Sequence, residues 1–232
     1  MPLLDLTALV FFFVCWLFYE PLLKASFRGG LINTDMAVVR AGWMRAMTRR
    51  TEGRIMDGQL LGHAINSASF FASSNLLLIA AVAGALFGGE ATFAAVSKLE
   101  TITTSSRMLF EWQLALVMIT LARGLLAFIW AIRQLNYCVA VIGAAPEGED
   151  VDPRVREAYA QAATAVLNPA LSSFNAGVRG YYFSLAGACW LFGAPALIAA
   201  TAGAVALLAW RQRRSRAAEA IRRLRSLLDS EA

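Results

Sequence analysis

Histidine is almost absent from this sequence, and its scarcity excludes a whole class of site. The only histidine is His63, so the chain cannot supply the several imidazoles of a histidine-based metal centre. The HExxH zinc motif, the GxxxxGK[ST] phosphate loop and the GxSxG nucleophile elbow are also missing. We therefore expect no metal, no cofactor and no enzymatic activity. An intramembrane enzyme acting on lipid is a weak third hypothesis.

Cysteine and lysine are scarce as well. The three cysteines, Cys15, Cys138 and Cys189, form no CxxC pair and lie in or beside apolar segments, which favours buried apolar roles over a disulfide framework. Of the 21 basic residues only Lys24 and Lys98 are lysines, so 19 are arginines, and the net charge is +5. Because the arginines flank apolar segments, they indicate anionic lipid headgroups as partners rather than nucleic acid.

What the sequence has in excess is apolar residues. Hydrophobic residues make up 58% of the 232 positions, and the mean hydropathy is +0.56, whereas soluble domains are nearer half apolar. Residues 3–22, 66–88 and 109–132 each predict a helix that can cross a hydrocarbon core of roughly 30 Å at about 1.5 Å per residue. The helical pattern of the second segment reaches back to Arg54. The sequence therefore predicts an all-α, polytopic membrane helix bundle with helices extended into the cytoplasm.

The apolar run from Tyr181 to Trp210 could cross the membrane once or twice. A single crossing gives four spans and separates the seven basic residues after Trp210 from the seven of the first loop, against the positive-inside rule. A turn at residues 193–195 instead gives five spans, the fourth beginning near Phe174 and the fifth near Pro195. Every strongly basic segment then faces the cytoplasm. We expect five spans with the N-terminus outside and the C-terminus cytoplasmic, and four spans are the alternative.

Three stretches carry a family resemblance. They are WMRAMTRRTEGRIMDGQLLG followed by SFFASS, then WAIRQLNYCVAVIGAAP, and then FNAGVRGYYFSLAGACW. Together they resemble the bacterial integral membrane family catalogued as domain of unknown function 599, over nearly the whole chain except the arginine-rich tail. The resemblance implies a multi-pass protein of the bacterial inner membrane and supplies no catalytic residues.

Arg123 is the sharpest candidate for a polar or solute site. It lies in the middle of the third predicted span, where an arginine costs roughly 2.5–3.5 kcal/mol to insert and is a functional candidate by default. Asn75 and Ser74, on the antiparallel second helix, should lie at a similar depth. We expect Arg123 to contact the second helix near Asn75. The alternatives are an arginine that attracts an anion, or one bonded to backbone carbonyls or to another subunit.

A second group of polar residues is expected near the inner ends of the helices. Asp57 is the expected partner of Arg133 or Arg179, either in a pocket for an anionic group or in an ion-pair network that ties helices together. The candidate members are Asp57, His63, Arg133, Gln134, Asn136, Tyr137, Asn175 and Arg179. On the second helix, a polar stripe at three- and four-residue spacing either lines a cavity or forms an interhelical contact; its members are Gln59, His63, Asn66, Ser67, Phe70 and Ser74.

Residues 211–232 form a basic amphipathic tail beyond a membrane bundle of residues 1–210. Its apolar residues recur at three- and four-residue spacing and predict a helix; they are Ala218, Ile221, Leu224 and Leu228. We expect the helix of residues 211–228 to lie against the anionic headgroups of the cytoplasmic leaflet. The rival hypothesis is that its stripe docks on an amphipathic helix of residues 38–47, or on a partner protein.

Two functions of different classes follow. The leading hypothesis is a non-enzymatic inner-membrane protein that self-associates as a homo-oligomer and acts as a scaffold or accessory subunit. The alternative is a small channel or transporter for an anionic or polar solute that uses Arg123.

Overall fold

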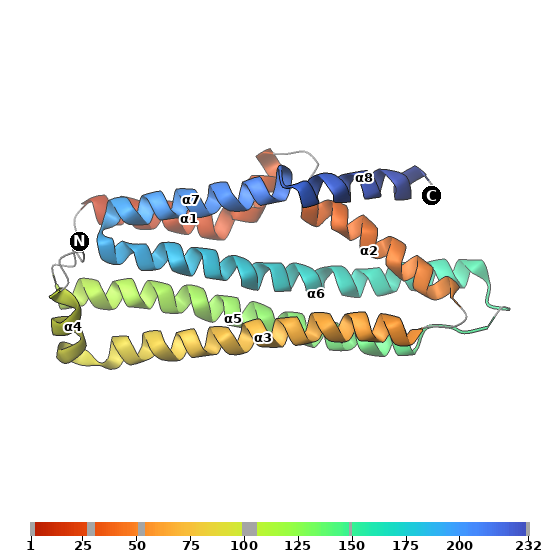
Figure 1. Cartoon of the computed structure of the whole chain (residues 1–232), viewed down its shortest axis with the longest axis horizontal. Helices are drawn as coiled ribbons and strands as arrows, with labels where there is room; N and C mark the ends of the chain where they lie inside the picture. The colour runs from red at the N-terminus through yellow and green to blue at the C-terminus, as the bar shows by residue number, and fades with distance from the viewer. Residues whose placement is uncertain (1–2, 27–30, 51–53, 99–105, 149, 231–232) are drawn as a thin grey trace. The chain divides into compact units, whose positions relative to one another are not determined.

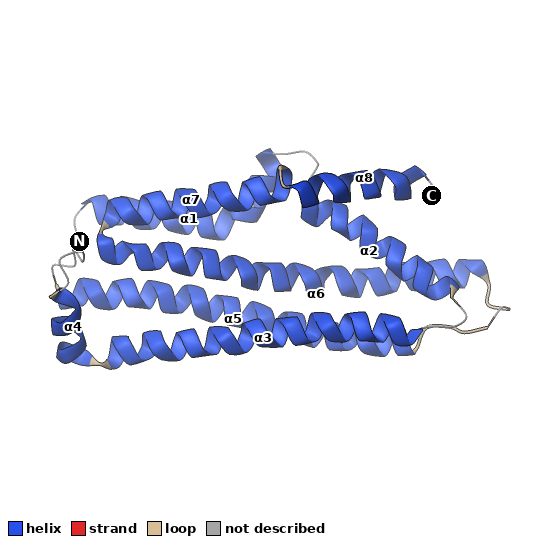
Figure 2. Ribbon diagram, viewed as in Figure 1, coloured by secondary structure: helices blue, strands red, loops and turns tan. Residues whose placement is uncertain are grey.

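The structure, a computed structural model, describes residues 3–26, 31–50, 54–98, 106–148 and 150–230, and every regular element among them is helical (Figures 1 and 2). The elements are α1 (Leu3–Ser26), α2 (Ile32–Arg49), α3 (Arg54–Phe87), α4 (Gly89–Ser97), α5 (Arg107–Gly143), α6 (Pro153–Ala188), the 3-10 helix η1 (Cys189–Phe192), α7 (Ala194–Arg213) and α8 (Arg216–Ser230). The expected all-α helix bundle is confirmed.

Three helices are much longer than a membrane crossing requires. At about 1.5 Å per residue, α3, α5 and α6 each extend roughly 50 Å or more, against a core of roughly 30 Å. The helix α3 begins at Arg54, and α5 continues without a break through the polar residues near Tyr137 to Gly143. Helical structure therefore continues well beyond the apolar segments, as the sequence predicts.

Four stretches are long and apolar enough to cross a membrane. They lie in Leu3–Leu23, Arg54–Phe87, Arg107–Gly143 and Ala194–Ser230. The helix α6 is not among them, because polar residues such as Arg179 lower its hydropathy. By length and composition, the described chain therefore has four candidate spans. Length and composition alone do not make the second half of α6 a fifth span.

The run from Tyr181 to Trp210 is not one helix. After α6 the chain tightens into η1 and reverses at Gly193, whose φ of 103° lies in the region that favours glycine. The amide of Gly193 donates to the carbonyl of Trp190 at 2.9 Å, and the amide of Leu197 donates to the carbonyl of Gly193 at 3.2 Å. The helices α6 and α7 thus meet in the turn that the five-span reading requires at residues 193–195 (Figure 1).

The helices divide into two compact units. The first comprises Met1–Arg28, Ser73–Leu126 and Gly177–Trp210, and so includes parts of five long helices, α1, α3, α5, α6 and α7. Its core is rich in aromatic side chains, and the rings of Phe12 and Phe183 meet edge to face at 5.9 Å. The core members are Ala8, Phe12, Tyr19, Leu116, Phe183, Ala186, Trp190, Ala194, Leu197 and Leu208.

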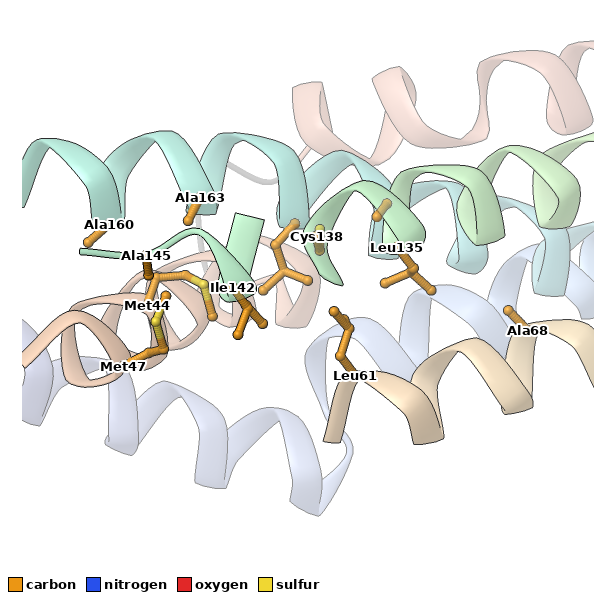
Figure 3. Close-up of a cluster of buried hydrophobic side chains, with 12 residues drawn as sticks. Met44, Met47, Leu61, Ala68, Leu135, Cys138, Ile142, Ala145, Ala160 and Ala163 are labelled. Atoms are coloured by element: carbon orange, nitrogen blue, oxygen red, sulfur yellow. The ribbon is translucent and has the colours of Figure 1, made fainter. Parts of the chain in front are cut away.

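The second unit comprises Gly29–Ala72, Ala127–Ala176 and Arg211–Ala232. Alanines of α6 let the helix approach its neighbours closely, and Met44 and Met47 of α2 fill the remaining space (Figure 3). The fully or nearly buried members are Met44, Met47, Leu61, Ala68, Leu135, Cys138, Ile142, Ala145, Ala160, Ala163, Leu167 and Ala170. This packing buries α2, predicted as a surface helix, on one face.

Candidate functional site

In the first unit, α5 and α6 cross at two glycines. A Cβ added to Gly180 would lie 3.1 Å from the Cα of Gly124, and a Cβ added to Gly124 would lie 3.4 Å from the carbonyl oxygen of Gly177. Small residues of this kind let membrane helices bring their backbones together. The crossing sets the positions of the side chains on either side of it.

Asn75 of α3 fills the space beside Gly124. Its side chain is 1% exposed, and its Nδ2 donates to the carbonyl of Leu121 at 3.1 Å. The same nitrogen lies 3.0 Å from the position that a Cβ of residue 124 would occupy. Its Oδ1 is buried and accepts no hydrogen bond from any residue that the structure describes. Asn75 therefore joins α3 to α5, and the preceding residue, Ser74, is half-buried.

The expected contact between Arg123 and Asn75 is wrong. Arg123 is exposed, and its guanidinium lies over the ring of Trp16 in α1, 5.1 Å from the ring centroid. The reason is helical geometry: Leu121 and Gly124 face α3, so the side chain between them points elsewhere. Arg123 thus joins α5 to α1 by a cation–π contact, which is worth about 0.5–2 kcal/mol.

Arg179, next to Gly180, also contacts α1. Its Nη2 donates to Oε2 of Glu20 at 2.9 Å, and its guanidinium lies 5.9 Å from the ring centroid of Tyr19. The hydroxyl of Tyr19 is buried without a hydrogen bond. Each of these arginines directly precedes a glycine of the crossing, Gly124 or Gly180. Both contact one stretch of α1, which contains Trp16, Tyr19 and Glu20.

A second buried polar cluster joins α1 to the turn after α6. The indole Nε1 of Trp190 donates to Oδ1 of Asp5 at 2.8 Å, and Nε2 of Gln113 donates to the carbonyl of Trp190 at 2.9 Å. All three residues are at most 8% exposed. Sequence reasoning did not single out this cluster; the one signal was an acidic residue at the start of an apolar helix.

The second unit pairs Asp57 differently from the expectation. Its Oδ1 accepts hydrogen bonds from Trp43 Nε1 at 2.7 Å and from Arg50 Nη2 at 2.9 Å, and its side chain is 1% exposed. The predicted pairing with Arg133 or Arg179 is therefore wrong. A nearer arginine, seven residues before Asp57, reaches the carboxylate because α2 folds back against α3.

The other members of the expected inner-end group form separate contacts. Arg133 Nε donates to the hydroxyl of Tyr137 at 2.7 Å on the exposed side of α5. Ser173 donates to Gln134 at 3.2 Å, and Asn175 donates to Asn33 at 3.2 Å. Asn136 and His63 are exposed. These residues do not form one network, and the only ion pair of Asp57 in the described residues is with Arg50.

The predicted polar stripe on α3 lies on the surface of the second unit. Gln59, His63, Asn66, Ser67 and Phe70 are all exposed. On the same side, a Cβ added to Gly58 or Gly62 would have no atom within 4 Å. The stripe therefore lines no cavity between helices of this unit.

The tail helix α8 packs on α2. Arg225 Nη1 donates to Oδ1 of Asp35 at 2.7 Å, and the Asp35 side chain is 1% exposed. A Cβ on Gly42 would lie 3.4 Å from Leu228. Of the predicted apolar stripe, Ala218 is buried, whereas Leu224 is 44% exposed. One side of α8 therefore docks on α2, as the docking alternative predicts, and another side of α8 stays exposed.

Arg40 and Glu157, which link α2 and α6, have displaced pKa values. Burial lowers the pKa of Arg40, which donates to Oδ1 of Asn168 at 3.3 Å. Hydrogen bonds from Gln161 and then Arg45 lower the pKa of Glu157. Both groups form contacts between α2 and α6.

A family model for a protein of unknown function, DUF599, matches residues 7–217. The chain belongs to this family. No curated protein and no solved structure shows significant similarity to the chain. The family description assigns no activity to its members. Within the described residues, no three His, Cys, Asp or Glu side chains are grouped so that they could hold a metal ion.

Proposed function

We propose that this protein of the DUF599 family is a non-enzymatic, self-associating membrane protein that acts as a scaffold or accessory subunit. The observation that carries the proposal is the exposed face of α3, called here the α3 face and formed by Gly58, Gln59, Gly62, His63 and Asn66. It combines uncovered glycines with side chains that carry amide groups.

A second copy of the chain fits this face better than lipid does. The open space beside Gly58 and Gly62 lets another backbone approach. A two-fold axis along the membrane normal brings identical residues together at one depth. The amides of Gln59 and Asn66 each offer donors and an acceptor, so each can bond its own counterpart in the second copy.

The proposed topology has five spans, with the N-terminus outside and both basic segments in the cytoplasm of a bacterial inner membrane. Two observations support it. The chain reverses at Gly193, and the second half of α6 shares a unit with α1, α7 and the apolar halves of α3 and α5. Arg179 of that half is paired with Glu20, which lowers the cost of placing it near a membrane boundary.

Disulfide cross-linking tests the association. In a background without the three native cysteines, Asn66→Cys should form a dimer on mild oxidation of membranes, because the two sulfurs lie close to the axis. Leu60→Cys is the matched control, since Leu60 is exposed on another side of the same turn of α3. Equal yields at both positions, or monomer at Asn66→Cys, would contradict the α3 face as the contact.

Transport of an anionic or polar solute is the second candidate, supported by the positive charge of Arg123 within an apolar segment. The exposed position of Arg123 favours it less, because a permeation path would enclose the side chain. Flux of small anions into proteoliposomes that is abolished in Arg123→Leu would favour transport over the scaffold role.

A further inference from the structure

We propose that Arg123 and Trp16 form a binding site for the phosphate group of an anionic membrane lipid. The starting observation is the unfilled bonding capacity of Arg123. Its guanidinium carries five N–H donors, and it forms no hydrogen bond or ion pair within the described residues. Its one contact there is with the face of Trp16, 5.1 Å from the ring centroid. The ring face stabilises part of the positive charge of Arg123. It accepts no hydrogen bond from the N–H groups, because these point outward in the plane of the guanidinium.

The nearest carboxylate on α1 is already engaged. Glu20 accepts a hydrogen bond from Arg179 at 2.9 Å, in a pair whose arginine side chain is only 17% exposed. In the described residues, Arg179 thus has a carboxylate partner on α1, whereas Arg123 has only the ring of Trp16.

The surroundings of Arg123 identify the source of the anion. Ile119 and Leu126, one turn before and one turn after Arg123, are 54% and 66% exposed, so they share its face of the helix. On α1, Leu17 beside Trp16 is 45% exposed. An apolar surface of this kind within candidate spans faces acyl chains, so the molecule that reaches Arg123 along it is a lipid.

The depth of the site is compatible with a headgroup. Helical rise places Trp16 about 20 Å from Leu3, within a core of roughly 30 Å, and so in the leaflet opposite the α1 N-terminus. Tyr19 and Glu20 lie about one turn further along α1, nearer the inner boundary of the core, where Tyr side chains are favoured. Arginines near it draw phosphate groups and water toward themselves by local thinning of the bilayer.

Phosphate is the anion that matches the donor set. The planar guanidinium offers paired N–H groups to two oxygens of one phosphate, and such bidentate charge-assisted bonds are stronger than neutral ones. The Trp16 ring holds the opposite face of the guanidinium and so limits the orientations of the arginine. Lysine lacks the fork and cannot replace it fully.

Native mass spectrometry of the purified full-length chain tests the site. The detergent-solubilised protein is titrated with phosphatidylglycerol and, in parallel, with zwitterionic phosphatidylcholine. Both lipids carry a phosphate, but the choline cation cancels its charge and repels the guanidinium. Wild type should therefore retain one phosphatidylglycerol about tenfold more tightly than phosphatidylcholine, a difference of the size of one charge-assisted bond. In Arg123→Gln this preference should vanish. Arg133→Gln is the matched control, because it removes one exposed charge ten residues along the same helix and should keep the preference.

Three further variants keep the test valid if Arg123→Gln does not fold. Trp16→Leu retains the charge but loses the ring and should lower the preference, whereas Trp16→Phe should retain most of it. Arg123→Lys should fall between wild type and Arg123→Gln. An unchanged preference in Arg123→Gln and Trp16→Leu, or an equal loss in Arg133→Gln, would overturn the proposal.

Inorganic phosphate separates a lipid from a soluble source. Added at millimolar concentration, it should leave the bound phosphatidylglycerol in place, because the lipid is also held by its acyl chains. Complete displacement by inorganic phosphate alone would show that the site takes a soluble phosphate and would overturn the assignment to lipid. Dimer formation by Asn66→Cys is independent of this result, so the two proposals can fail separately.

Discussion

Gly124 and Gly180 lie face to face where α5 crosses α6, so close that a Cβ on Gly180 would come within 3.1 Å of the Cα of Gly124. The neighbouring atom is backbone and cannot move aside as a side chain can. This crossing places Arg123 and Arg179 against α1 and leaves room for the amide of Asn75. The polar contacts of Asn75, Arg123 and Arg179 therefore depend on this crossing.

Gly180→Ala should destabilise the protein. Overpacking of this kind costs about 1–3 kcal/mol, whereas alanine gains up to about 1 kcal/mol over glycine in a helix. We expect a net loss of about 1–2 kcal/mol in reversible unfolding by SDS in mixed micelles. Gly203→Ala is the control, because a Cβ at Gly203 of α7 meets no atom within 4 Å. It should be neutral or slightly stabilising, and a loss equal to that of Gly180→Ala would contradict the argument.

Replacing Trp43 by Phe should weaken the attachment of α2 to α3. The substitution removes the 2.7 Å hydrogen bond from the indole to the buried carboxylate of Asp57 and leaves Arg50 as the remaining donor. A lost bond to a buried charged group costs about 1.5–3 kcal/mol. The same SDS titration measures the loss, and Trp130→Phe provides a control at an exposed tryptophan of α5. Equal effects of the two substitutions would show that the hydrogen bond is unimportant.

Arg225→Gln should release α8 from α2. It removes the partner of Asp35, whose carboxylate is 1% exposed and accepts the Arg225 bond at 2.7 Å. Hydrogen exchange of the α8 amides should accelerate about tenfold, which corresponds to a bond of roughly 1.4 kcal/mol. Arg223→Gln, on the exposed side, should leave the exchange rates unchanged. If both variants exchange like wild type, the ion pair does not hold the helix.

The uncovered side of α8 remains available to a membrane surface. Leu224 and Leu227 are 44% and 62% exposed, with Arg223 beside them. A synthetic peptide of residues 211–228 should gain helicity with anionic vesicles and lose it at high salt, because each basic residue contributes about 1 kcal/mol near such a surface. A peptide that ignores anionic lipid would leave docking on α2 as the one role of the helix.

Labelling of single cysteines in intact cells should report the five-span topology. In a background free of native cysteines, Ala94→Cys in α4 should react with an impermeant maleimide, whereas Ala46→Cys in α2 and Ala217→Cys in α8 should react only after lysis. All three positions are exposed, so burial cannot explain protection. Labelling of Ala217→Cys from outside would restore the four-span topology.

Acidification should weaken the contact between α2 and α6 through Glu157. Its pKa is lowered in the folded protein, so its stabilising contribution is present above the ordinary glutamate pKa of about 4.3 and is lost as pH falls through the lower folded value. The effect is small, because Arg45 and Glu157 are 38% and 39% exposed. Glu157→Gln should flatten the stability profile below about pH 4, and an unchanged acid profile would contradict this role.

The sequence by itself determined the helical class and the apolar segments that are long enough to cross a membrane, and it favoured a turn at residues 193–195. Apolar length and periodicity are local properties, and the segregation of arginines constrains which segments share a side. The continuation of α5 to Gly143 also agrees with the sequence, and Leu135 and Cys138 of this part of the helix enter the core of the second unit. The family resemblance also came from the sequence and is confirmed over residues 7–217.

Only the tertiary structure decided the polar partners. Depth along a helix can be estimated from its rise, but the direction of a side chain around the axis depends on which neighbour each face meets. Arg123 and Asn75 were placed at similar depth, yet the close approach of Gly124 to Gly180 turns Asn75 toward Leu121 and leaves Arg123 for Trp16. Asp57 likewise pairs with Arg50, because α2 folds back and brings a nearer arginine than either predicted partner. The partner of a polar side chain depends on how each helix is rotated about its axis and on which helices pack against it. Neither can be derived from residue spacing along the sequence.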